Sequence, residues 1–212
     1  AIILGTLGLF ERKLPGNSDL RDMVEEMKTA ATSASLLARR LLRLGRTEPL
    51  EFERFSLGSL VQRTVSMMAR QMPGIDIHAD VSDALTLNGS QEELHQVLVN
   101  LFLNARDAMP DGGTLRVYAR EIALDRAQAA TLHLPTKGDY VELVVTDSGS
   151  GMDEATLGRA FDPFFTTKPA GRGTGLGLAM IHSIVRRHGG GIVAESVLGH
   201  GSTFRIWLPR SV

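Results

Sequence analysis

Glycine is concentrated in one part of this chain, and that concentration restricts how the chain can fold. Of the 22 glycines in 212 residues, 12 lie between Gly149 and Gly201. A residue without a side chain lets the backbone turn sharply or approach a ligand closely. We therefore predict that this region has tight loops between its helices and strands, and that these loops are candidate ligand contacts.

Residues 48–212 show the periodicities of a mixed α and β domain. Ser90 and Glu93 form a capping box at the start of the strongest helical segment. The patterns predict an α+β fold in which helices pack on one face of a mixed, largely antiparallel sheet. The predicted helices are 57–71, 91–109 and 175–188, and the predicted strands are 51–56, 75–81, 114–124, 140–146, 192–197 and 203–208.

Residues 1–47 have a different pattern, which is typical of a coiled coil. After a turn at Pro15–Ser18, apolar residues from Leu20 to Leu44 follow one another at alternating spacings of three and four. This spacing predicts a helical hairpin with an apolar stripe for further helices. Because two helices bury too little surface alone, we expect a homodimer that forms a four-helix bundle. The alternative is a helix that lies on its own domain.

Charge and composition exclude several classes of protein. The net charge is −1, cysteine is absent, and the longest nearly apolar run, Ala1–Phe10, has ten residues. Binding of nucleic acid by bulk charge, disulfides and thiolate metal sites are therefore not expected. A membrane span needs about 20 apolar residues, and no signal peptide is recognisable. We expect this part of the protein to be cytoplasmic, with any membrane attachment made by parts outside this chain.

The predicted helix 91–109 carries a polar stripe beside its apolar face. Gln96, Asn100, Asn104 and Asp107 lie at spacings of four, four and three, so they share one side of the helix. Neutral amides offer uncharged oxygens that complete the octahedral shell of a Mg²⁺ ion already held by phosphates. An ordinary solvated helix face is the alternative.

A carboxylate and two glycines follow the predicted strand 140–146. Asp147 comes directly after the strand, and Gly149 and Gly151 let the backbone pass close to a flat ligand. A carboxylate accepts a hydrogen bond from an exocyclic amine, so it can select adenine over guanine. The alternative is a turn in which the aspartate bonds its own backbone.

Two further motifs lie between residues 161 and 178. The first, Phe161–Lys168, contains three phenylalanines that could dock on the core, and the second, Gly171–Leu178, is glycine-rich and runs into a helix. Free N–H groups at a helix N-terminus favour phosphate. A dinucleotide fold is disfavoured because no strand directly precedes the glycines, and the lysine of a P-loop is missing. The motifs of Ser/Thr/Tyr protein kinases are also missing.

The order of these motifs resembles the ATP-binding catalytic domain of sensor histidine kinases, in the GHKL superfamily. Asn100–Met109 and Phe161–Leu178 match that pattern closely, in the style of nitrogen-regulator-like and hybrid bacterial kinases. The resemblance implies a Bergerat-type α/β sandwich over residues 48–212, with ATP and Mg²⁺ as cofactors. It also implies that residues 1–47 are part of a dimerisation and phosphotransfer hairpin.

The resemblance also implies roles for individual residues. Asn104 would coordinate Mg²⁺, Asn100 would support the nucleotide, and Asp147 would bond the adenine amine. Asn100, Asn104 and Lys168 would carry the catalysis, and residues 162–174 would form a mobile lid. The other implied ATP contacts are Asp107, Gly149, Gly151, Phe165, Thr167, Arg172, Gly173, Thr174, Gly175, Leu176, Gly177 and Thr203.

The sequence departs from the family pattern in two places. Asp107 stands where many histidine kinases have a basic residue, which resembles the chaperone and gyrase branches. Asn100 stands where those ATPases have a glutamate, and an amide cannot take a proton from water at neutral pH. None of the six histidines lies in residues 1–47, so the resemblance places the phosphoacceptor just before Ala1. We expect His95, His182 and His188 to lie on helix surfaces.

We therefore expect a catalytic fragment of a two-component sensor kinase. It would transfer the γ-phosphoryl group of Mg·ATP to a histidine, from which a response-regulator receiver domain would take it. The alternatives are an ATP-hydrolysing GHKL machine and a non-catalytic nucleotide-binding module. A serine kinase of the anti-sigma type would not need the hairpin.

Overall fold

The computed structural model describes residues 51–169 and 173–210. All of them belong to the compact unit Pro49–Val212. The predicted hairpin, its four-helix bundle, the domain boundary at residues 47 and 48, and Arg172 lie outside the described residues.

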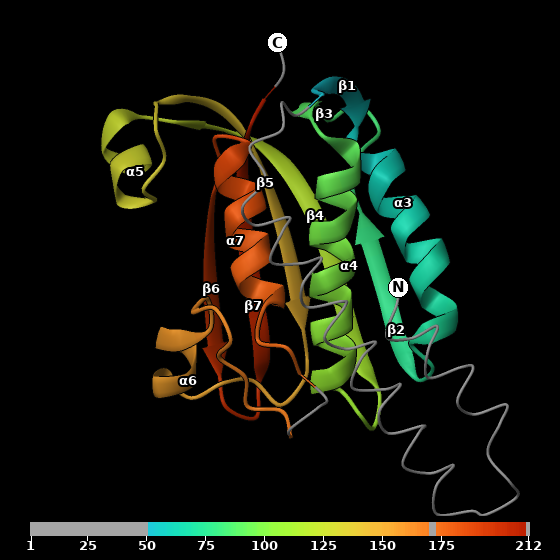
Figure 1. The fold of residues 1–212 in the computed structure, drawn as a ribbon. Coiled ribbons are helices and arrows are strands. Elements are labelled where there is room, and N and C mark those ends of the chain that lie inside the picture. Colours follow the sequence, from blue (N-terminus) through green and yellow to red (C-terminus); the bar gives the residue numbers. More distant parts are fainter. Residues whose placement is uncertain (1–50, 170–172, 211–212) are drawn as a thin grey trace, which may run out of the picture. The chain divides into compact units, whose positions relative to one another are not determined.

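A five-stranded sheet forms the centre of this unit (Figure 1). Its strand order is β2-β4-β5-β7-β6, in which β2 and β4 run parallel and the other neighbours are antiparallel. The predicted mixed, largely antiparallel sheet is therefore confirmed. The strands are β2 (Ile75–Asp80), β4 (Gly113–Leu124), β5 (Gly138–Asp147), β6 (Gly191–Val197) and β7 (Gly201–Pro209).

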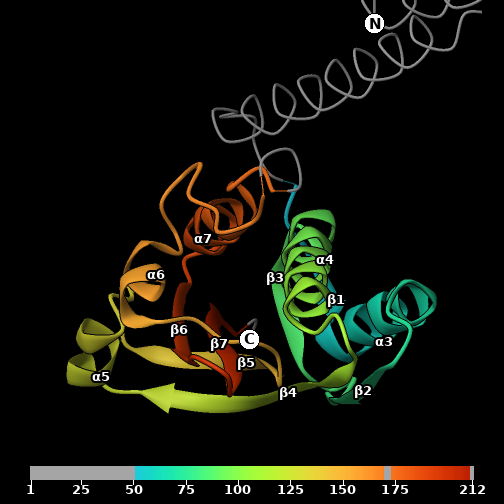
Figure 2. The same ribbon diagram turned by 90° about the horizontal axis from the view of Figure 1, so that it is seen from below.

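Three helices cover one face of this sheet, as Figure 2 shows from below. They are α3 (Leu57–Met68), α4 (Gln91–Ala108) and α7 (Gly177–Arg187). The side chain of Ser56 caps α3, and the side chain of Ser90 caps α4 by accepting from the N–H of Glu93 at 3.3 Å. Such caps satisfy N–H groups that a helix cannot pair internally.

Several short elements were not expected from the sequence. An unexpected strand, β3 (Thr86–Gly89), pairs antiparallel with β1 (Glu53–Ser56), which lies within the predicted strand 51–56. A 3₁₀ turn, η1 (Ala69–Gln71), ends the first predicted helix, and two short helices, α5 (Arg126–Thr131) and α6 (Glu154–Arg159), lie in the connections. The last predicted helix starts two residues late, at Gly177, because the glycine-rich segment before it stays a loop.

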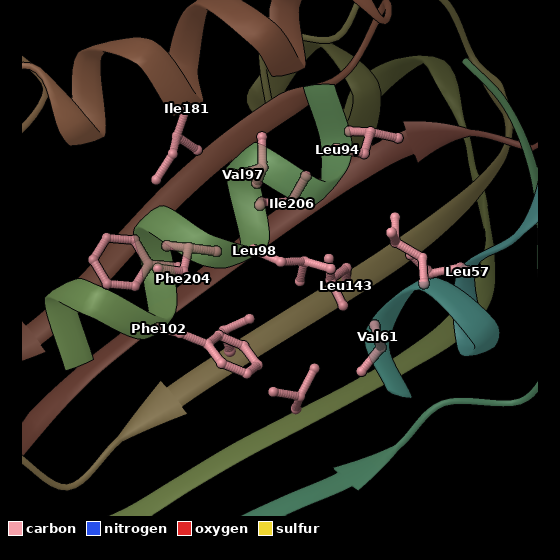
Figure 3. Close-up of a cluster of buried hydrophobic side chains, with 14 of the residues drawn as sticks. Leu57, Val61, Leu94, Val97, Leu98, Phe102, Leu143, Ile181, Phe204 and Ile206 are labelled. Carbon is pink, nitrogen blue, oxygen red and sulfur yellow. The ribbon is translucent and has the colours of Figure 1, made fainter. Parts of the chain in front are cut away.

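The main apolar core lies between the sheet and the three helices. Figure 3 shows Phe102 and Leu98 of α4 beside Leu143 of β5 and Phe204 of β7. Phe102 is fully buried. Adjacent strand residues point to opposite faces, so the neighbours of this core form a second cluster on the outer face. That second cluster contains Leu124, Ala129, Leu134, Tyr140 and Trp207.

Candidate functional site

The polar stripe of α4 lies against the start of α7. A side chain at Gly177, the first residue of α7, would begin 4.0 Å from both amide atoms of Asn104. Asn104 is half-buried, whereas Asn100 is buried. The Asn100 amide lies 3.8 Å from the sulfur of Met180 on α7 and accepts from Gln96 at 3.4 Å. Asn104 is therefore the amide of this stripe that faces the glycine-rich approach to α7.

The last member of the stripe, Asp107, is held by two cations. The Lys168 ammonium donates to its Oδ2 at 2.5 Å, and the Arg106 guanidinium donates twice to its Oδ1, at 2.7 and 3.0 Å. Burial alone would raise the pKa of Asp107, but the hydrogen bonds from Lys168 and Arg106 outweigh it and the pKa is lowered. The Lys168 ammonium therefore contacts α4 through Asp107, although 61 residues separate the two in the sequence.

Asp147 ends β5, a central strand of the sheet, and is buried. Its Oδ1 accepts from the backbone N–H of Gly149 at 2.9 Å. Burial raises the pKa of Asp147, although the backbone amides of Gly149 and Ser202 act in the opposite direction. The turn in which the aspartate bonds its own backbone is therefore present. The Asp147 carboxylate that forms it is the same one that is predicted to select adenine.

The loop after Asp147 joins the carboxylate to α4. A side chain at Gly149 would collide with Ala108 of α4, and the N–H of Ser150 donates to the Ala108 carbonyl at 2.9 Å. Gly151 has φ +64 and lies directly against the Val197 carbonyl, so it combines a left-handed backbone with a close approach. The loop that follows Asp147 therefore lies against the C-terminal end of α4, the helix that carries the amide stripe.

Thr203 lies on β7, next to the strand that carries Asp147. Its hydroxyl is 3.0 Å from the hydroxyl of Thr146, and its neighbour Ser202 is paired with Asp147 in the sheet register. Thr203 is half-buried. Because side chains alternate along a strand, Thr203 shares a face with Thr146, and the β7 residue on the same face as Asp147 is Ser202.

The predicted lid segment folds back onto itself. Phe164 has a left-handed backbone, with φ 70, and its N–H donates to the carbonyl of Gly175 at 2.8 Å. Phe165 is half-buried beneath the Arg159 guanidinium, which lies 4.3 Å from its ring centroid. The expected docking of all three rings on the core is wrong, because Phe164 is 57% exposed. The left-handed backbone at Phe164 turns this side chain outward.

The remaining predicted lid residues lie in the same loop. Thr167 is exposed, Gly173 is half-buried, and the Thr174 hydroxyl accepts from the N–H of Leu176 at 3.4 Å. Leu176 is fully buried and anchors the start of α7. Its buried apolar side chain leaves only its backbone for a ligand.

A resident metal site is not built into the described residues. Between residues 51 and 169 and between 173 and 210, no three His, Cys, Asp or Glu side chains gather to hold an ion. Both Asp107 oxygens already accept from cations. The donors present fit Mg²⁺ only if a ligand's phosphates supply most of its shell, with Asn104 adding a neutral oxygen.

Three residues of the site were not predicted from the sequence. Arg106 neutralises Asp107, Arg159 covers Phe165, and the backbone of Ser202 bonds Asp147. Arg106 could have been found by its position beside Asp107. The roles of Arg159 and Ser202 depend on tertiary contacts that spacing does not reveal.

One histidine expectation is wrong. His188 is buried at the end of α7, where its Nε2 accepts from the N–H of Ser90 at 3.0 Å and its Nδ1 lies 2.8 Å from the Ile184 carbonyl. His95 and His182 are half-buried, and His182 lies beside the ring of Phe161. Sequence periodicity missed the burial of His188 because its neighbours are distant in the chain: Phe52 just before β1, Gly89 at the end of β3 and Ser90 at the start of α4.

Residues 89–212 match the family model described as histidine kinase-, DNA gyrase B-, and HSP90-like ATPase. The sensor kinase CckA of Brucella abortus (strain 2308) is 39% identical over 89% of this chain, which corresponds to 20% of CckA. The sensor histidine kinase ZraS of Escherichia coli (strain K12) is 32% identical over 99% of this chain and 42% of ZraS. The chain thus spans less than half the length of these relatives.

A solved structure shows the same fold. The histidine kinase ThkA, crystallised in complex with the response regulator protein TrrA, superimposes with a TM-score of 0.69 at 21% identity. The match covers 99% of this chain and 57% of ThkA. Among the described residues, no helix combines the length and the apolar character that crossing a bilayer requires.

Proposed function

The chain belongs to the histidine kinase-, DNA gyrase B- and HSP90-like ATPase family and carries the catalytic domain of a sensor histidine kinase, and we propose that it binds Mg·ATP and transfers the γ-phosphoryl group to a histidine side chain. The observation that carries this proposal is that three chemically different groups are each tied to the C-terminal turns of α4, by their position on it, by an ion pair with Asp107 or by a loop contact with Ala108. These groups are the amide of Asn104, the ammonium of Lys168 and the carboxylate of Asp147.

Each group suits one part of a nucleotide. The buried Asp147 carboxylate accepts from the adenine amine, and Thr203 is offered as a further contact from the neighbouring strand β7. Asn104 would hold Mg²⁺ together with phosphate oxygens, and a bound metal would supply neutralisation of the phosphate charge. Lys168 adds a positive charge beside the phosphates, and the N-terminus of α7 supplies backbone N–H groups.

The residue types favour phosphoryl transfer over hydrolysis. The Asn100 amide is buried, bonded to Gln96 and close to Met180, and an amide cannot act as a general base. Asp107 is the carboxylate nearest to Asn104 on α4, and its two oxygens accept from Lys168 and Arg106. Positioning alone suffices when the nucleophile is supplied by another side chain.

Two proposals concern the rest of the protein. Residues 1–47 form the helical hairpin through which two copies dimerise, and the phosphorylated histidine is supplied from outside these residues, because no histidine lies among them. A response-regulator receiver domain then takes the phosphoryl group, by analogy with the complex of ThkA and TrrA.

The first test measures nucleotide binding by calorimetry. Asn104→Ala is expected to abolish the part of ATP affinity that depends on Mg²⁺, because it removes the neutral metal ligand. Asn88→Ala is the matched control, since Asn88 is an exposed amide on β3 outside the site. Unchanged Mg²⁺-dependent affinity in Asn104→Ala contradicts the assignment.

The second test follows the phosphoryl group. The chain is incubated with Mg·ATP labelled on the γ-phosphate, alone and joined to a histidine-bearing helix placed before residue 1. Acid-labile label on the joined form only, with little free phosphate, is the expected result. Continuous phosphate release by the chain alone would identify an ATPase instead.

A further inference from the structure

The ion pair between Asp107 and Lys168 ties two separate parts of the site together. Asp107 lies on α4, and Lys168 lies in the loop between α6 and α7. Their side chains are 29% and 35% exposed, so both remain within reach of solvent. A pair of this kind is weak and exchangeable, because water competes for both charges.

The pair also lies close to the position proposed for the polyphosphate. Asp107 follows Asn104 by three residues, so the two side chains are neighbours on one face of α4. A polyphosphate bound with Asn104 would carry several negative charges within one helical turn of this ion pair. Asp107 would repel those charges, and Lys168 would be attracted to them.

Arg106 makes it possible for Lys168 to leave. Its guanidinium already donates twice to Asp107 Oδ1, so the carboxylate keeps a cationic partner when the ammonium moves. The backbone of Lys168 is separately anchored, since its N–H donates to the Thr166 hydroxyl at 3.1 Å. Only the flexible side chain of Lys168 needs to change position.

We propose that the Lys168 ammonium moves from Asp107 to the polyphosphate when nucleotide binds, an inference that rests on the proposed nucleotide site. Asp107 is then a positioning residue that competes with the nucleotide for the lysine. It holds the ammonium at the site while the site is empty, and it limits affinity for nucleotide that arrives without metal. The part of the nucleotide that would bind Lys168 is the polyphosphate group, not the adenine.

A double-mutant cycle tests the competition with metal-free ADP in EDTA, measured by calorimetry. Asp107→Asn is expected to tighten ADP binding by about three- to tenfold when Lys168 is present, the size of coupling usual for residues in contact. In the Lys168→Met background, Asp107→Asn is expected to tighten ADP binding by less than about twofold. This smaller gain comes only from removing the repulsion between Asp107 and the phosphates. Equal gains in both backgrounds would overturn the proposal.

Two controls separate transfer of the lysine from simple charge compensation. In the cycle of Asp107→Asn with Arg106→Met, the gain is expected to be no smaller in the Arg106→Met background, because without Arg106 the carboxylate holds Lys168 more tightly. Adenosine, which has no phosphate, is expected to bind all variants equally. A gain that falls in the Arg106→Met background as it does in the Lys168→Met background, or a change with adenosine, contradicts the proposal.

Failure of this inference is distinguishable from failure of the proposed function. If the unmodified chain binds neither ADP nor Mg·ATP, both are wrong. If it binds them and the Lys168 cycle shows no excess, the nucleotide site stands and only the exchange is wrong.

Discussion

At the scale of single residues, Asp147 shows how one side chain serves structure and chemistry together. It closes a turn with the N–H of Gly149 and is buried at the end of a central strand. From the sequence these were two competing readings, because an Asp-x-Gly turn has the same letters with or without a ligand. The structure keeps the turn and pairs Asp147 with Ser202 of β7 in the sheet.

The assignment of Asp147 to adenine predicts a selective loss. Asp147→Asn is expected to weaken ADP binding by about tenfold, the value of one hydrogen bond to a charged group, and GDP binding by less than about twofold. Calorimetry with both nucleotides measures the difference. Equal losses would remove the adenine role.

The raised pKa of Asp147 predicts a dependence on pH. The adenine amine needs the ionised carboxylate as acceptor, so ADP affinity is expected to fall on acidification at a pH above 3.8, the ordinary value for aspartate. The Asp147→Asn variant should lack this acid-side fall. A fall of the same size in the variant would assign the titration to another group.

The amide stripe shows the limit of spacing as evidence. Helical periodicity correctly placed Asn100, Asn104 and Asp107 on one side of α4. It could not show that Met180 covers Asn100 while Asn104 faces Gly177, because those neighbours come from α7. The side of a helix is therefore predictable from the chain itself, and its partner is not.

At the scale of elements, one histidine joins the far ends of α4 and α7. His188 accepts from the N–H of Ser90, which caps α4, and stacks on Phe52 with ring centroids 5.0 Å apart. Close by, Arg187 pairs with Glu93 at 2.5 Å. Because α4 carries Asn104 and α7 begins at Gly177, this contact helps to set how the two helices meet at the site.

This histidine predicts a loss of stability in acid. Burial lowers the pKa of His188, so the unfolded chain binds protons more readily than the folded one below pH 6.5. The stabilising contribution is complete above that pH and is lost as the pH falls through 6.5 toward the lowered value. Urea unfolding at pH 8 and pH 5.5 measures it.

Two variants of His188 separate its packing from its titration. His188→Ala is expected to cost about 2 kcal/mol at pH 8, because it leaves the Ser90 N–H unpaired and opens a cavity. His188→Gln keeps an acceptor and should reduce the acid-side loss. The loss that remains is expected to involve His182, whose pKa burial also lowers. An undiminished loss in His188→Gln would contradict the assignment.

The elements that the sequence missed are those with little periodicity of their own. β3 has four residues, and α5 and α6 have six each. Such lengths hold fewer than two turns of helix or two outward residues of a strand, so the apolar pattern has no full repeat to reveal. The long elements were predicted to within about two residues at most ends, since their repeats are complete.

At the scale of the described unit, the two apolar clusters share strands. Val141 of β5 and Ile206 of β7 face the helices, while their neighbours Tyr140 and Trp207 face the outer cluster. Alternation along a strand places both clusters on one backbone. The sheet therefore couples the outer face, which carries α5, to the helical face, which carries the candidate site.

This coupling predicts a single cooperative unfolding transition. Trp207 is the one tryptophan of the chain and lies in the outer cluster, whereas ADP binding reports on the helical face. Leu134→Ala in the outer cluster is expected to cost about 2 kcal/mol and Phe102→Ala in the main core about 4 kcal/mol. In urea, each change should lower the midpoint of Trp207 fluorescence and the midpoint of ADP binding together, with ADP affinity in water unchanged for Leu134→Ala. If Leu134→Ala shifted only the fluorescence midpoint, the outer cluster would unfold on its own and would not support the site.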